Sequence, residues 1–155
     1  MQGNKKIIAT LNKLLAGELA ARDQYFVHAR MYEDWGYRKL YERIWHEMED
    51  ETAHAAALVQ RILFLGGTPD VRPGVAPNIG KDVPSMMAND LAYELAVVKN
   101  LKKAVAECEV EGDYVTRELL EGLLKDTEED HTHWLEQQLG LIERLGLPNY
   151  LQSQL

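Results

Sequence analysis

Four glutamates and two histidines stand at positions where apolar residues are expected. In the second long helical stretch, apolar residues recur at steps of three and four, and Glu51 and His54 interrupt them. The fourth stretch repeats this pattern with Glu128 and His131. Residues three apart lie on the same helix face, so each pair should point inward with the apolar stripe. One glutamate interrupts the stripe in each of the other two stretches, namely Glu18 and Glu94.

Counting from the glycine turns places these glutamates at matching heights. Glu18 lies about five helical turns before Gly36, and Glu51 lies about four turns after it. In an antiparallel hairpin the two therefore differ in height by about one helical turn, roughly 5 Å. In the second hairpin, Glu94 lies about five turns before Gly112, and Glu128 lies about four and a half turns after it. Both hairpins are therefore expected to bring their carboxylates together near their middles.

Four ionised carboxylates inside a helical bundle would repel one another, and their burial would cost several kcal/mol each. Two divalent cations would cancel this charge, and neutral imidazoles would complete their coordination. Carboxylates with imidazoles suit iron, manganese or zinc better than calcium or magnesium. A glutamate from each of two helices, with Glu-x-x-His from each of two others, is the arrangement of ferritin-like di-iron sites. The pattern thus predicts a dinuclear metal site.

The elements that must position these residues are four long helices. We expect them at about residues 4–34, 37–65, 84–111 and 114–145, followed by a short C-terminal helix within residues 149–155. Residues 66–84, which lead into the third helix, hold four of the five prolines, and this spacing excludes a helix across the segment. Its roughly 18 extended residues can span up to about 60 Å, more than the roughly 42 Å length of a 28-residue helix. The sequence therefore predicts an all-α, ferritin-like four-helix bundle with one long crossover, as a single domain over residues 1–155.

Composition excludes several classes of protein. There are 17 basic and 25 acidic residues, a net charge of −8, which argues against binding of nucleic acid or anionic membranes and permits attraction of cations. The single Cys108 cannot form an internal disulfide, which fits a reducing compartment. We find neither a signal-peptide pattern nor an apolar stretch long enough for a membrane span. A cytoplasmic location is expected.

At its metal-site residues the chain resembles the bacterioferritin and bacterial ferritin family, and the resemblance extends over essentially the whole length. The similar segments are LNKLLAGELAARDQYFVHARMYEDWG, VQRILFLGGTP, NIGKDV, DLAYELAVVKNL, DYVTREL, EEDHTHWLE and GLPNYLQSQL. The resemblance implies a homo-oligomeric shell of 24 subunits with a di-iron ferroxidase centre in each. It implies that Glu51 and Glu128 bridge the irons, that Glu18 and His54 complete one, and that Glu94 and His131 complete the other.

The chain departs from the haem-binding members of this family at Thr52. Those members carry a methionine immediately after the bridging glutamate of the second helix, and a threonine hydroxyl is a poor ligand for haem iron. Met48 is about 6 Å away along the helix, and Arg22, Asp23 and Glu49 do not suit an apolar haem pocket. We therefore expect a haem-free protein. A haem-containing bacterioferritin, or a shell mixed with a haem-binding paralogue, is the alternative; without haem, a role for a ferredoxin partner is not favoured.

The fourth helix departs from the family in another way. The segment TEEDHTHW is one residue longer before its histidine than the common form, and it offers Glu129 or Asp130 with His133 as competing pairs. Only Glu128 and His131 continue the apolar stripe, so we select that pair.

Three other residues are secondary candidates. His46 and Asp50, four residues apart, could hold a transit iron on the inner surface of the shell, although a solvated charged face is the favoured explanation. Tyr25 lies two turns after Glu18. It could be a hydrogen-bond partner of a metal ligand or an electron donor, or simply a core tyrosine.

The sequence thus predicts iron storage and detoxification. Fe(II) would be oxidised to Fe(III) at the di-iron site by O2 or H2O2, and the product would be stored as a mineral inside the shell. One alternative is a di-iron peroxidase or oxidase that does not store iron. Another is a storage shell whose site binds metal without oxidising it.

Overall fold

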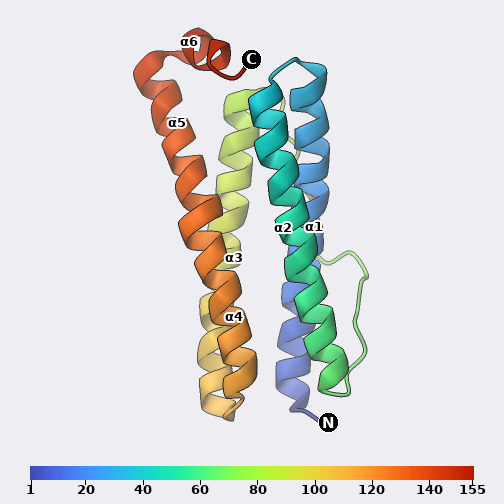
Figure 1. Cartoon of the computed structure of the whole chain (residues 1–155). Coiled ribbons are helices and arrows are strands. Elements are labelled where there is room, and N and C mark those ends of the chain that lie inside the picture. Colours follow the sequence, from blue (N-terminus) through green and yellow to red (C-terminus); the bar gives the residue numbers. More distant parts are fainter.

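The computed structural model describes residues 1–155 and contains only helices and their connections (Figure 1). The helices are α1 (Lys5–Asp34), α2 (Arg38–Phe64), α3 (Val83–Glu111), α4 (Tyr114–Asp126), α5 (His133–Leu145) and α6 (Leu147–Gln152), with a π-helix (Thr127–Thr132) joining α4 to α5. The predicted all-α bundle with a short C-terminal helix is confirmed. None of the helices contains an apolar stretch of the length that a bilayer crossing requires.

Local sequence signals fix where the helices begin and turn. The Asn4 side chain accepts a hydrogen bond from the Lys6 amide at 2.7 Å and caps α1. Asp82 and Ser85 form a reciprocal capping box at the start of α3. Gly36 and Gly112 have φ angles of 84° and 72° at the two tight turns, a conformation that other residues rarely adopt. These turns make α1 antiparallel to α2, and α3 antiparallel to α4, as Figure 1 shows.

The crossover between α2 and α3 runs back along the outside of α1 and α2, so that α3 starts at the opposite end and runs parallel to α2 (Figure 1). Its last part is fastened to the bundle by buried side chains. His28 Nδ1 and Gln24 Nε2 lie 2.9 and 2.7 Å from Asp90 Oδ1. His28 Nε2 accepts the Gly80 amide proton at 3.1 Å, and Gln24 Oε1 accepts that of Asn78 at 2.9 Å. These contacts join α1, α3 and the crossover.

The apolar core is divided into two clusters, one toward each end of the bundle. One contains Leu11, Leu15, Leu58, Ile62, Leu101 and Leu120, among others. The second contains Tyr32, Leu40, Ile44, Met86, Met87 and Leu135, among others. Between them lies a layer of buried polar residues, including Glu18, Glu51, His54, Glu94 and His131. The interruptions of the apolar stripes therefore mark a single polar layer within the bundle.

The last long helix differs from the continuous helix expected over residues 114–145. Residues 127–132 form a π-helix, whose turn is one residue wider than an α-helical turn. The Thr127 hydroxyl donates to the Leu123 carbonyl at 2.8 Å within this region. Leu120 in α4 and Leu135 in α5, on either side of the π-helix, both lie in the core.

Candidate metal centre

Five of the six predicted ligands converge in the polar layer. His54 Nδ1 lies 3.6 Å from both Glu18 Oε2 and Glu51 Oε2. His131 Nδ1 lies 3.0 Å from Glu51 Oε1 and 3.4 Å from Glu94 Oε1. The five residues form two groups of possible ligands, each with its atoms within 4.8 Å of one another, and Glu51 belongs to both. This is the geometry of two metal positions that share one carboxylate.

These side chains are buried and largely lack hydrogen-bond partners. Their exposed fractions range from 0% for Glu94 to 5% for His54. The atoms without a hydrogen-bond partner are Glu18 Oε2, Glu51 Oε2, Glu94 Oε2, His54 Nδ1 and His131 Nδ1. Buried polar groups without partners are rare and costly. Here they meet at one place, and their oxygen and nitrogen donors fit divalent cations such as iron, manganese or zinc.

The two histidines are arranged in the same way. Their rings stack with centroids 5.9 Å apart and planes 16° apart. In each ring Nδ1 faces the glutamates of the two ligand groups, and Nε2 points away from the centre of the cluster. The α2 helix and the π-helix thus present matching imidazole edges to the centre.

Burial and mutual repulsion change the protonation of these groups. Burial, followed by the charge of Glu51, raises the pKa of Glu18 to about 8. Burial also raises the pKa of Glu94. Burial alone would lower the pKa of His54, but the nearby carboxylates of Glu18 and Glu51 outweigh it and raise that pKa to about 11. Contacts with carboxylates likewise outweigh burial and raise the pKa of His131. The cluster therefore retains protons at neutral pH that a cation would displace.

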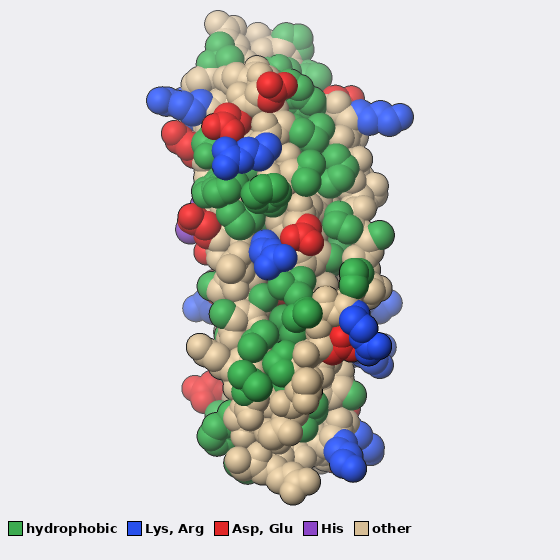
Figure 2. Space-filling model, turned by 90° about the vertical axis from the view of Figure 1, so that its right-hand side faces the viewer, with side chains coloured by type: hydrophobic (Ala, Val, Ile, Leu, Met, Phe, Trp, Pro, Cys, Tyr) green, Lys and Arg blue, Asp and Glu red, His purple; other side chains and the backbone are tan.

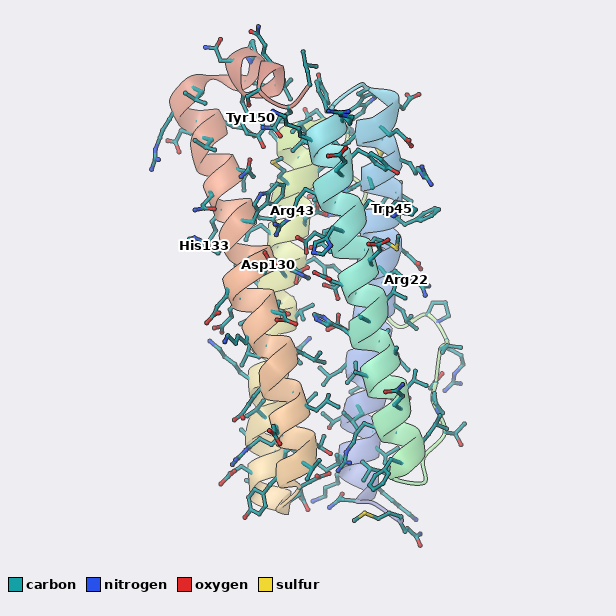
Figure 3. All side chains as sticks on the ribbon, in the orientation of Figure 1. Arg22, Arg43, Trp45, Asp130, His133 and Tyr150 are labelled. Atoms are coloured by element: carbon teal, nitrogen blue, oxygen red, sulfur yellow. The ribbon has the colours of Figure 1, made fainter.

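Glu128, the sixth predicted ligand, does not lie with the others. Its side chain is 42% exposed, and its carboxylate lies 3.1 Å from Lys102 Nζ. The prediction assumed an α-helix, in which Glu128 and His131 share a face. The π-helix places them on different faces, so His131 points inward and Glu128 outward. The competing His133 also points away from the bundle (Figure 3).

The structure brings three further residues to the centre that the sequence did not identify. Glu47 is 2% exposed, and its Oε2 lies 2.6 Å from His131 Nε2. Arg43 Nη2 lies 2.6 Å from Glu47 Oε1 and 2.7 Å from Asp130 Oδ1, and Figure 3 shows Arg43 and Asp130 in the space between α2 and the last long helix. Asp126 Oδ2 lies 3.3 Å from His54 Nε2. Glu47 did interrupt the apolar stripe of α2, which was a usable signal.

Glu47 also belongs to a third group of possible ligands, with Asp50, Asp130 and His131. The Arg43 guanidinium already lies between Glu47 and Asp130 there and contacts both carboxylates. We therefore interpret this group as the surroundings of His131.

The secondary candidates are placed as follows. The Tyr25 hydroxyl is buried and donates to Glu94 Oε1. His46 Nε2 lies 3.4 Å from Asp50 Oδ2, with side chains 56% and 31% exposed. Thr52 is exposed, and its hydroxyl donates to the Met48 carbonyl at 2.9 Å.

Comparisons with known proteins show which proteins this chain is similar to. Residues 8–145 match the model of the ferritin-like domain. The chain is 61% identical to a protein named bacterial ferritin from Synechocystis sp., over 100% of this chain and 99% of that one. It is 60% identical to a bacterial ferritin of Pseudomonas aeruginosa, over the full length of both. A bacterioferritin of Mycolicibacterium paratuberculosis is 38% identical over 97% of this chain and 94% of its own.

Proposed function

Because this chain belongs to the bacterial ferritin family, we propose that it stores iron and that its buried cluster of glutamates and histidines is the ferroxidase centre. The observation that carries this proposal is the convergence of buried carboxylate and imidazole atoms that lack hydrogen-bond partners. Two Fe(II) ions would satisfy these atoms and offset the charge of the carboxylates. Residues 1–155 would act as one domain.

In the proposed reaction, two Fe(II) substrate ions each give one electron to O2, which also takes up two protons and leaves as H2O2. With H2O2 as oxidant, the same two electrons and two protons yield two molecules of water. The protein binds the two ions close together, so both electrons can be delivered in one event. Glu51 would bridge the ions, Glu18 and His54 would bind one, and Glu94 and His131 the other. Tyr25 would hold Glu94 in place.

Glu128 has a separate part in this proposal. The charge of Glu18, Glu51 and Glu94 leaves one positive charge of two divalent ions uncompensated, and a fourth carboxylate would balance it. To bridge the ions, Glu128 has to leave Lys102 and turn inward, with a local change in the π-helix. If it does so, Glu128→Ala will weaken metal binding at both positions. Glu129→Ala, in the same segment, is the matched control.

The proposed storage compartment is a homo-oligomeric shell of 24 subunits in the cytoplasm. The side of the bundle that carries the crossover shows hydrophobic side chains along much of its length (Figure 2). Exposed large apolar residues of α1, α2 and the crossover include Phe26, Leu63, Phe64, Val71, Val75 and Ile79. Such a surface is typical of subunit interfaces. His46 and Asp50 would bind iron in transit to the interior. We propose a haem-free shell on the basis of Thr52.

Addition of Fe(II) in air tests this function. Glu18→Ala and Glu94→Ala should lose the fast oxidation phase while the shell, measured by native mass, still assembles. Glu42→Ala, an exposed carboxylate of α2, should behave as the wild type. Wild-type rates in the first two variants would overturn the assignment of the centre. Fast oxidation by a protein of small native mass would instead support a non-storage oxidase or peroxidase.

A further inference from the structure

We propose that Glu47 and Arg43 position His131, and that the Glu94–His131 half of the centre consequently holds metal more tightly than the Glu18–His54 half. This inference rests on the proposed ferroxidase centre. It concerns residues that lie outside the set of metal ligands.

Both ring nitrogens of His131 face carboxylates. Nδ1 faces Glu51 and Glu94, while Nε2 lies 2.6 Å from Glu47 Oε2 and 3.3 Å from Asp50 Oδ2. When Nδ1 binds a metal, the proton resides on Nε2. Glu47 is placed to accept a hydrogen bond from this N–H group. Such a carboxylate fixes the tautomer and orientation of a ligating histidine and makes it a stronger base. Glu47 is 2% exposed, so water competes little for this contact.

Arg43 holds Glu47 in this role. Its guanidinium lies 2.6 Å from Glu47 Oε1, the oxygen that does not face His131. It also lies 2.7 Å from Asp130, and it stacks on the Trp134 ring at 4.8 Å from the centroid. These contacts restrict the guanidinium to one place and provide the positive charge that a buried carboxylate requires. Glu47 is therefore held with its other carboxylate oxygen directed at His131.

The equivalent contact of His54 is weaker. Its Nε2 lies 3.3 Å from Asp126 Oδ2, and the Asp126 side chain is 62% exposed. Water can replace this carboxylate, and no arginine holds it in place. The glutamates differ in the same direction, because the buried Tyr25 hydroxyl donates to Glu94, whereas Glu18 has no such donor. The two halves thus share Glu51 but differ in how firmly their remaining ligands are held.

Titration of the metal-free, full-length protein with Co(II), followed by its visible absorption, tests this inference. The wild type should bind two ions per chain in two steps. Loss of an outer carboxylate typically weakens metal binding by about 10–100-fold. Glu47→Gln, which preserves shape, should weaken the tighter step by about that factor and change the absorption of the first ion bound. Asp126→Asn, the matched control on His54, should leave the tighter step and its spectrum unchanged.

Arg43→Met supplies a second variant at a partly exposed position, and it should weaken the tighter step in the same direction. The inference is overturned if Glu47→Gln leaves the tighter step unchanged, or if it weakens the looser step instead. Glu51→Ala tests the centre itself, because loss of the shared ligand should weaken both steps. Retention of both steps in Glu51→Ala would count against the proposed function, whereas an unaffected Glu47→Gln alone would count only against this inference.

Discussion

Replacement of Glu94 by glutamine separates the charge of the centre from its shape. The carboxamide fills the same space, and its oxygen can still accept the hydrogen bond from Tyr25. Glu94 is fully buried, and burial raises its pKa, so its ionised form is costly in the metal-free protein. The Glu94→Gln variant should therefore be at least as stable as the wild type without metal, and less stable with it.

The size of the effect follows from binding linkage. A metal present at about a hundred times its Kd stabilises the folded state by about 2.7 kcal/mol. For a chain of 155 residues, each kcal/mol corresponds to about 2–4 °C in Tm, so the wild type should gain roughly 5–11 °C. The variant lacks one of the three converging carboxylates and should gain less than about 2 °C under the same conditions.

Thermal unfolding with and without Co(II), followed by circular dichroism, measures both quantities. Glu42→Gln provides a control on a solvated carboxylate of α2. Two results contradict the reasoning. One is an equal Co(II)-induced rise in Tm in Glu94→Gln and the wild type. The other is a clear fall in the Tm of the metal-free variant, which would mean that Glu94 stabilises the bundle without any cation.

Three further predictions concern protons, the crossover and haem. Because the pKa values of Glu18 and His54 are raised to about 8 and about 11, Co(II) binding at pH 7 should release protons, measurable by calorimetry in buffers of different ionisation enthalpy. Glu18 and His54 stabilise the metal-free fold at low pH and lose that contribution as the pH rises. The Tm of the metal-free protein should therefore fall from pH 6.5 through 8, and a Tm that does not change over this range would contradict the prediction. His28→Ala breaks the buried pair with Asp90 and should lower the free energy of unfolding by about 3–5 kcal/mol in urea titrations, whereas a loss below about 1 kcal/mol would show that the pair contributes little. A visible spectrum of the purified protein should lack a Soret band, and a strong band would refute the interpretation of Thr52.

Much of the fold could be predicted because it depends on local signals. Apolar residues at steps of three and four defined the long helices, and Gly36 and Gly112 placed the turns between them. Pro69, Pro73 and Pro77 excluded a helix across the segment between α2 and α3. The length of that segment then determined the topology. The convergence of Glu18, Glu51, His54, Glu94 and His131 followed from the same counting.

The remaining features depend on tertiary packing. Leu120 and Leu135 are both buried, in α4 and α5 on either side of the π-helix. The helix widens between them, and this determines the direction of Glu128. The contacts of His28 with Gly80 and Asp90 join residues that are far apart in the chain, and no local sequence pattern predicts them. Arg43 and Glu47 had the spacing of a helical ion pair, but their role depends on His131 from another helix.

The widened turn at residues 127–132 also affects how this protein can evolve. Insertion or deletion of one residue in a continuous α-helix would rotate all later side chains about the helix axis. The apolar face of that part of the helix would then no longer point into the core. Here a gain or loss of one residue can be confined to a single turn, while the flanking segments keep their registers. The side chain that this turn directs toward the metal centre can therefore change while the rest of the subunit keeps its structure.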